Sequence, residues 1–295
     1  MLTLKGFEAS GIVVPIVTPF TQKQIINKSI LCELVRRLIE AGIHGIVTPG
    51  STGEFYALED AEKIKLMESV VNEVDHKIPV WGGTGAVTTR KSIELTQRAE
   101  KIGVDAVMVI SPFYILPNED ELFYHYKAIS DNTNLPVIIY SNPNRTHVSF
   151  SEAIIERLAQ IDNIVGIKDS SGQPALITEY IRNTSNSFSI LTGHDPLILF
   201  SLMHGAKGAV SAIANIVPSL VVGLYENFRN GNFREAQKKQ KQITELHNVL
   251  KIGTFPAGIK EALEIIGVRV GPARFPVKNL SIKSRACLQA IIKDL

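Results

Sequence analysis

The sequence predicts a (β/α)₈ barrel, a TIM barrel of the α/β class, with a C-terminal helical extension. Short apolar segments alternate with amphipathic helical segments, which is typical of a parallel sheet covered by helices. Eight such units fit into the first 230 or so of the 295 residues, close to the length of about 250 residues usual for this barrel. The segment "PIVTPF" after the start of the first strand contains no glycine, which disfavours the alternative, an open doubly wound sheet with a Gly-rich phosphate loop.

Each expected strand is a short apolar, often β-branched run bounded by polar or turn residues. In chain order the strands are Gly11–Val17, Gly45–Thr48, Pro79–Gly82, Ala106–Ile110, Val137–Tyr140, Val165–Ile167, Ser189–Leu191 and Gly208–Val210. The segments between them place apolar residues three or four positions apart, as on one face of a helix. These helical segments are Lys28–Ala41, Ala61–Val74, Arg90–Ile102, Asp120–Asn132, Ser151–Gln160, Ala175–Asn183, Leu197–His204 and Ser219–Asn230.

The chain after the eighth unit continues with helical patterns only. We expect about three helices there, with a break at Gly253–Pro256 and a loop around Gly271–Arg274. Because no linker or low-complexity segment precedes them, these helices are expected to pack on the barrel. We therefore divide the chain into a catalytic barrel, residues 1–230, and a helical extension, residues 231–295.

Composition excludes several classes of function. A formal net charge of +2 lacks the basic surplus of a nucleic-acid-binding protein. The apolar runs are too short to span a bilayer, and Met1–Glu8 has no apolar signal-peptide core. Cys32 and Cys287 are far apart in helical patterns, which suggests reduced thiols and a cytoplasmic protein. We expect neither a nucleic acid nor a membrane as partner.

Polar residues cluster where the expected strands end, which is the catalytic side of such a barrel. Together with small residues of the same rim, they give the candidate site residues, which in chain order are Gly50, Ser51, Thr52, Tyr114, Tyr140, Arg145, Lys168, Gly193 and Ala212. The seven histidines have no zinc-like spacing. "GSTGE" lacks the lysine of a phosphate-binding loop, and "GGTGAV" lacks the last glycine of a dinucleotide fingerprint. We therefore expect a site without metal or cofactor.

Lys168 is the most informative of these residues because it ends an apolar strand, where an ammonium group is costly to bury. Partial desolvation lowers the pKa of an amine from about 10.4, and a neutral amine attacks carbonyls to form a Schiff base. The imine withdraws electrons from the neighbouring carbon, so carbon–carbon bonds can form or break. Tyr140, one strand away, is the candidate proton shuttle. A structural ion pair between Lys168 and Asp169 is the alternative.

Two further groups on this rim are candidates for binding carboxylates. The hydroxyls and backbone N–H groups of Ser51 and Thr52, in a turn bounded by glycines, suit one carboxylate, and Arg145 suits a second in bidentate fashion. His194 and Asp195 are expected to line the pocket through their backbone, with Asp195 capping the next helix.

Seven motifs occur together along the chain: "VTPF", "GSTGEF", "GGTGA", "SPFY", "YSNPNRT", "GIKDSSG" and "GAKGAVSAIANIVP". In their order and spacing the sequence resembles the dihydrodipicolinate synthase / N-acetylneuraminate lyase family of class I, pyruvate-handling aldolases. The resemblance implies that Lys168 forms the Schiff base, that Tyr140 is the acid/base, and that Ser51 and Thr52 bind the pyruvate carboxylate, with Ser51 also relaying protons. It implies that Tyr114 reaches across a subunit interface in a homotetramer built as a dimer of dimers.

The second substrate is an aldehyde whose identity is left open between several members of the family. Arg145 favours the synthases, in which an arginine binds a carboxylate-bearing aldehyde. The sialic-acid lyases typically lack this arginine. Two features depart from the usual synthase pattern: Ser51 in place of threonine, and the run "KDSSG". The segment "GTFPAGIKEALEIIGVRVGPARFPVKNLS" is more similar to 4-hydroxy-2-oxoglutarate and 2-keto-3-deoxy-sugar-acid aldolases. A keto-deoxy-sugar-acid dehydratase and a non-catalytic 2-oxo acid sensor are further alternatives. The residues at the positions of lysine-feedback sites, Asp60, Lys63, Val87 and Lys91, lead us to expect no inhibition by lysine.

Overall fold

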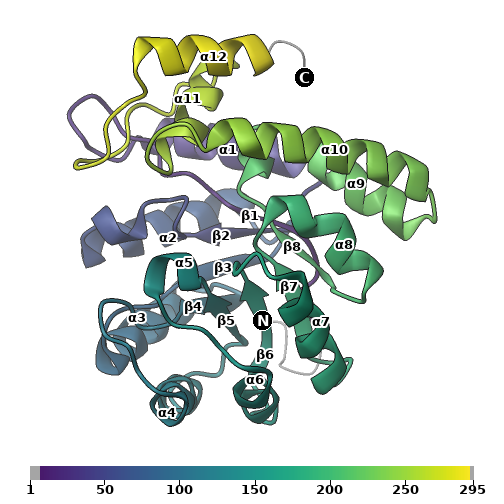
Figure 1. The fold of residues 1–295 in the computed structure, drawn as a ribbon. Coiled ribbons are helices and arrows are strands. Elements are labelled where there is room, and N and C mark those ends of the chain that lie inside the picture. Colours follow the sequence, from purple (N-terminus) through teal and green to yellow (C-terminus); the bar gives the residue numbers. More distant parts are fainter. Residues whose placement is uncertain (1–6, 293–295) are drawn as a thin grey trace.

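The computed structural model describes residues 7–292 and contains a closed barrel of parallel strands (Figure 1). The strands are β1 (Gly11–Pro15), β2 (Gly45–Thr48), β3 (Val80–Gly83), β4 (Ala106–Ile110), β5 (Val137–Ser141), β6 (Ile164–Asp169), β7 (Ser189–Thr192) and β8 (Gly208–Val210). Each strand pairs with the next, and β8 pairs with β1 to close the barrel. The predicted fold class is confirmed. Most of Met1–Glu8, where we expect no signal peptide, lies outside the described residues.

Helices form the outer layer around the strands (Figure 1). They are α1 (Lys28–Glu40), α2 (Asp60–Val74), α3 (Thr89–Ile102), α4 (Glu119–Ser130), α6 (Glu152–Leu158), α7 (Pro174–Asn183), α8 (Ile198–Met203) and α9 (Pro218–Arg229). Short helical turns follow four of the strands: η2 (Phe55–Ala57), α5 (Pro143–Thr146), η3 (Asp195–Leu197) and η4 (Ile213–Asn215). The side chains of Asn27 and Ser151 cap α1 and α6 by accepting backbone N–H bonds, as such residues favour at helix starts.

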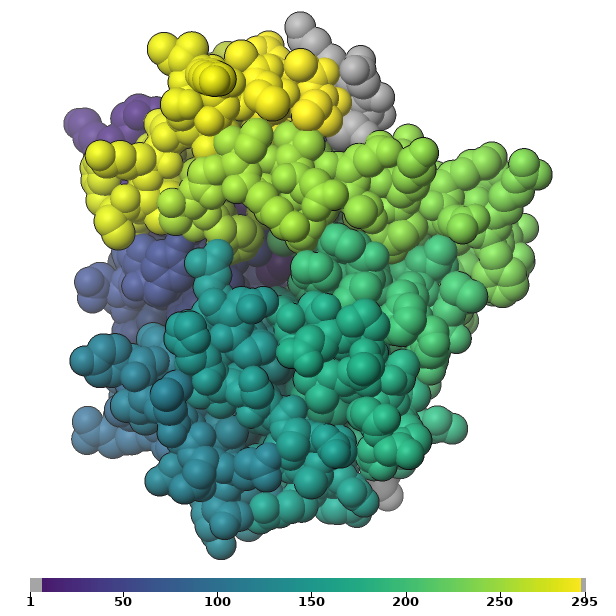
Figure 2. Space-filling model, viewed as in Figure 1, coloured from purple at the N-terminus to yellow at the C-terminus, as the bar shows by residue number. Residues whose placement is uncertain are grey.

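The C-terminal helices are α10 (Phe233–Leu250), α11 (Ala257–Ile265) and α12 (Ile282–Ile292). They lie together on one side of the barrel, where the space-filling view shows them as a continuous layer (Figures 1 and 2). α10 packs on α9, η3 and α8, and α11 contacts η4. Helices are thus found where the sequence predicts them, and the division of the chain at residue 230 stays a prediction.

The barrel interior is filled by alternate residues of the strands, including Val13, Val47, Trp81 and Met108. Because successive strand residues face opposite sides of a sheet, Tyr140 continues the inward row that begins at Ile138. A larger core lies between the strands and the helices. The inward row therefore delivers polar side chains to the mouth of the barrel, where the apolar filling ends.

The sixth strand is longer than predicted. It runs to Asp169 because Lys168 and Asp169 pair with Tyr140 and Ser141 of β5. Apolar periodicity ends a strand at its last apolar residue, so it misses polar residues that are buried for a function. Lys168 therefore lies within a strand, whose backbone fixes its position.

Among residues 7–292 no helix is long and apolar enough to cross a bilayer, and a cytoplasmic location stays a prediction.

Candidate active site

Lys168 and Tyr140 are neighbours across the pairing of β5 and β6. Lys168 is only 5% exposed, and its Nζ lies 3.8 Å from the centroid of the Tyr140 ring. An ammonium over an aromatic face is attracted by the ring quadrupole. No ion pair among the described residues includes Lys168. The alternative of an ion pair with Asp169 is wrong, because the Asp169 carboxylate accepts a hydrogen bond from Ser171 Oγ at 2.6 Å instead.

The Tyr140 hydroxyl lies at the centre of a small polar network. It accepts a hydrogen bond from Asn142 Nδ2 at 2.8 Å and lies 3.4 Å from Ser51 Oγ. Burial raises the pKa of Tyr140, but the charge of Lys168 and the hydrogen bonds from Ser51, Asn142 and Lys168 together lower it below its usual value of 10.0. A phenol that ionises more readily is better suited to passing protons near neutral pH.

The residues Gly50–Glu54 form a turn directly after β2, which we call the carboxylate turn. The N–H of Glu54 donates to the Ser51 carbonyl at 3.1 Å, and the N–H of Phe55 donates to the Gly50 carbonyl at 3.2 Å. Thr18 Oγ1 donates to the Gly53 carbonyl at 2.6 Å and holds the turn from the barrel side. These bonds place Ser51 beside the Tyr140 hydroxyl.

A cavity of about 410 Å³ opens above Lys168. The predicted residues that line it are Ser51, Thr52, Tyr140, Arg145, Lys168, Gly193 and Ala212. Gly50 is not among these residues and lines a small neighbouring cavity with Ser51 and Tyr140. At Gly193 a Cβ atom would lie 2.6 Å from Lys168 Cε, so only glycine leaves room for the lysine side chain.

The helical extension supplies one wall of the cavity. Its lining residues there are His247, Leu250, Lys251, Gly253, Phe255 and Ile259. This wall was not predicted, because no local sequence pattern shows which distant segment folds over the mouth of the barrel. Asn142 was not predicted as a site residue either, although it follows Tyr140 by two positions, directly after β5, where a side chain on the same side is expected.

The rim of the cavity carries an arginine, a histidine and an aspartate. Arg145 is exposed on α5, and its guanidinium carbon lies 5.4 Å from the centroid of the Phe255 ring. Burial lowers the pKa of His194, and the nearby His247 lowers it further. The expectation that Asp195 caps a helix is wrong: its carboxylate accepts a hydrogen bond from the Ser211 hydroxyl and lies 3.8 Å from His247 Nδ1. Asp195 is itself the first residue of η3, whose N-cap is His194, so its side chain is not in the capping position.

Tyr114 does not join the other candidates within its own chain. Its side chain is 95% exposed, and it does not line the cavity that contains Lys168. Its φ of +77° lies in the left-handed region, which is unfavourable for a residue with a β-carbon.

The residues described by the structure contain no group of three or more His, Cys, Asp or Glu side chains arranged to hold a metal ion.

Comparison with known proteins agrees with this geometry. Residues 8–295 match the dihydrodipicolinate synthetase family. The chain is 36% identical over 98% of its length to the 4-hydroxy-tetrahydrodipicolinate synthase of Methanopyrus kandleri, of which it covers 97%.

Solved structures are similar over almost the whole chain. A dihydrodipicolinate synthase from Bacillus anthracis is 36% identical, with a TM-score of 0.96 and coverage of 98% of this chain and 99% of that one. YagE of Escherichia coli K12, a prophage protein of the same family in complex with pyruvate, is 30% identical, with a TM-score of 0.94 and coverage of 97% and 98%. The chain belongs to the dihydrodipicolinate synthetase family and is an enzyme of its kind, a pyruvate-dependent lyase of the class I aldolase type.

Proposed function

We propose that this enzyme condenses pyruvate with a carboxylate-bearing aldehyde through an imine on Lys168. The favoured reaction is that of 4-hydroxy-tetrahydrodipicolinate synthase, with aspartate semialdehyde as the aldehyde. The observation that carries the proposal is a buried lysine without a carboxylate partner among the described residues, stacked on Tyr140 beside the carboxylate turn. The name of the relative from Methanopyrus kandleri supports the choice of reaction.

The proposed reaction begins when the neutral amine of Lys168 attacks the C2 carbonyl of pyruvate. Tyr140 delivers a proton to the departing hydroxyl, so that water leaves and a C2 imine forms. Loss of a proton from C3 gives an enamine, and C3 then attacks the aldehyde carbon, whose oxygen takes up a proton. The amine of the aspartate semialdehyde unit then attacks the imine carbon and displaces the Lys168 amine, which closes the ring of the product and regenerates Lys168. With an aldehyde that has no amine, water hydrolyses the imine instead. Ser51 and Thr52 hold the pyruvate carboxylate throughout, and Arg145 holds the carboxylate of the aldehyde.

Reduction with borohydride in the presence of pyruvate tests the imine. The expected result is a pyruvate-derived group on Lys168, located by peptide mass spectrometry. Lys260 is an internal control, because it is also buried but paired with a carboxylate. Wild-type enzyme that gains no group on Lys168 would show that the mechanism is wrong.

A panel of aldehydes tests the second substrate. Pyruvate is supplied with aspartate semialdehyde, glyoxylate, glyceraldehyde or N-acetylmannosamine, and kcat/KM is compared. We expect the highest value for aspartate semialdehyde. Preference for glyoxylate or glyceraldehyde would replace the synthase by an aldolase of the same family, and loss of water from a keto-deoxy-sugar acid without carbon–carbon cleavage would identify a dehydratase. Pyruvate binding without any turnover would identify a sensor.

We propose that Tyr114 completes the site of a neighbouring subunit in a homotetramer. Its exposure and its unfavourable backbone angle support a role outside its own chain. The test is to mix two inactive variants, Tyr114→Ala and Lys168→Met, and to let their subunits exchange. If Tyr114 acts between subunits, mixed assemblies regain activity, since one site then contains both residues. Absence of regained activity in assemblies shown to be mixed would contradict the proposal.

A further inference from the structure

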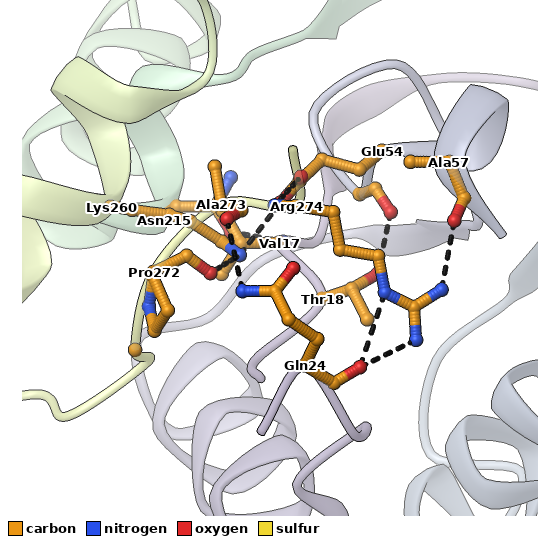
Figure 3. Close-up of polar contacts among 12 residues, drawn as sticks. Val17, Thr18, Gln24, Glu54, Ala57, Asn215, Lys260, Pro272, Ala273 and Arg274 are labelled. Atoms are coloured by element: carbon orange, nitrogen blue, oxygen red, sulfur yellow. Dashed lines mark hydrogen bonds and ion pairs between the residues drawn. The ribbon is translucent and has the colours of Figure 1, made fainter. Parts of the chain in front are cut away.

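A second buried lysine connects the helical extension to the carboxylate turn. Lys260 on α11 is 2% exposed, and its Nζ lies 2.6 Å from Glu54 Oε1 (Figure 3). The same ammonium donates a hydrogen bond to the Pro272 carbonyl at 2.9 Å. Burying two charges is tolerated only where they are paired and hydrogen-bonded. This ion pair therefore fixes the separation between α11 and Glu54.

Glu54 is held by both its side chain and its backbone. The second carboxylate oxygen accepts the backbone N–H of Arg274 at 2.8 Å, so residues of the extension bind both oxygens. The backbone N–H of Glu54 donates to the carbonyl of Ser51. Its φ of +59° lies in the left-handed region, where a glutamate remains only if its surroundings hold it. A shift of the Glu54 carboxylate is therefore transmitted to Ser51.

The Arg274 side chain holds the segment that follows the turn. Its guanidinium donates to the carbonyls of Ala57 and Gln24, each at 2.8 Å (Figure 3). It also donates to both oxygens of Glu62, at 2.5 and 2.6 Å. It also lies 4.4 Å from the ring centroid of Phe20. Arg274 of the extension thus binds Gln24, which precedes Glu54 in the sequence, and Ala57 and Glu62, which follow it. These contacts join residues more than two hundred positions apart.

The neighbouring residue on α11 faces the substrate cavity. Ile259 lines the cavity above Lys168, whereas Lys260 points to Glu54. One helix therefore contributes a wall of the cavity and also the counter-charge of the carboxylate turn.

We infer that Glu54 and Lys260 are positioning residues, through which the helical extension sets the place of Ser51 and Thr52 and so controls pyruvate capture. This inference rests on the proposed function in one respect, namely that the carboxylate turn binds the pyruvate carboxylate. Neither residue lines the cavity that contains Lys168, so they act through Ser51. We call this pair the Glu54–Lys260 clamp.

The first test is Lys260→Met, which leaves the buried Glu54 carboxylate without its cation. The pyruvate concentration for half-maximal borohydride trapping should rise about tenfold or more, while the trapping rate at saturating pyruvate changes less than about threefold. A purely structural role does not predict this split between binding and chemistry. Arg285→Met is the matched control, because it removes the Arg285–Glu261 pair of the same extension, which does not involve the carboxylate turn.

The second test combines Glu54→Gln with Lys260→Met, which replaces the ion pair by neutral side chains of similar shape. Because the uncompensated charge is then absent but the ion pair is still missing, half-saturation by pyruvate should recover only in part, to a value between those of Lys260→Met and the wild type. If Lys260→Met does not fold, Glu54→Asp serves instead, since it keeps the charge but shortens the side chain. It should raise the pyruvate concentration for half-saturation.

Unchanged half-saturation in folded Lys260→Met or Glu54→Asp would overturn the inference, as would a fall in the saturating rate alone. These outcomes are distinct from failure of the proposed function. If the wild-type enzyme is not trapped at all, the Lys168 mechanism fails. If it is trapped and the clamp variants behave like the wild type, only the positioning role fails.

Discussion

Lys168 and Lys260 are buried to nearly the same extent, 5% and 2% exposed, and each ammonium lies over an aromatic ring, at 3.8 and 4.3 Å. They differ in their polar partners. Lys260 has the Glu54 carboxylate and the Pro272 carbonyl, whereas no ion pair in the described part of the chain involves Lys168. The comparison shows how the same side chain serves two purposes. A compensated amine stabilises a junction, and an uncompensated one remains available to a carbonyl substrate.

The largest effect is expected from Lys168→Met. Without the amine no imine forms, so kcat should fall by about 10⁴-fold or more, as when a covalent nucleophile is removed from an enzyme. Steady-state assays with pyruvate and aspartate semialdehyde measure this loss. The control is Lys207→Met, because Lys207 pairs with Glu8 at the opposite end of the barrel, far from the cavity. Substantial remaining turnover would show that another group performs the chemistry.

Replacing the two lysines should have different effects on the free energy of unfolding. Lys260→Met leaves a buried carboxylate unpaired and should lower stability by about 3 to 5 kcal/mol. Lys168→Met removes a buried cation to which residues 7–292 supply no counter-ion, and it should leave the free energy of unfolding unchanged or raised. Urea unfolding followed by circular dichroism gives both values. Equal losses in the two variants would erase the distinction drawn between the lysines.

A smaller effect is expected at the rim of the cavity. Arg145→Ala should reduce kcat/KM for aspartate semialdehyde by about 10- to 100-fold, which corresponds to one charge-assisted contact. Half-saturation by pyruvate should remain near the wild-type value, since the carboxylate turn is untouched. Lys251→Met is the matched control, because this second cation also lines the cavity. A uniform loss for charged and neutral aldehydes would argue against carboxylate recognition by Arg145.

The smallest effect concerns the pH profile. The pKa of Tyr140 is below 10.0, because Lys168, Ser51 and Asn142 together outweigh the effect of burial. As pH rises through this pKa, the phenol loses its proton, so kcat/KM should fall on the alkaline side. Ser51→Ala removes one of the stabilising hydrogen bonds, so the alkaline limb should move to higher pH, with a loss in kcat of about tenfold. Tyr140→Phe should abolish the limb, and a limb that persists belongs to another group.

Much of the barrel could be predicted from local sequence. Helix and strand periodicities repeat in a fixed order, and parallel pairing brings all strand ends to one rim. That reasoning places Lys168 and Tyr140 on the same rim, and the register of β5 and β6 shows that they lie side by side, while their catalytic roles stay predictions. It failed where polar residues continue a strand, as in the last two residues of β6.

The junction between barrel and extension could not be predicted in the same way. Lys260 reads as one more polar position on an amphipathic helix, and Glu54 reads as the acidic end of a glycine-bounded turn. Only the tertiary structure shows that they meet, because an ion pair between distant segments leaves no periodic signal. The same holds for Phe255 and Ile259 in the cavity wall.

The adjacency of Ile259 and Lys260 on α11 has a consequence for protein engineering. Grafting this helix from a relative to widen the range of accepted aldehydes transfers the electrostatic partner of Glu54 in the same step. A graft without a cation at position 260 leaves the buried Glu54 carboxylate unpaired. Successful chimaeras therefore have to exchange α11 and the carboxylate turn together.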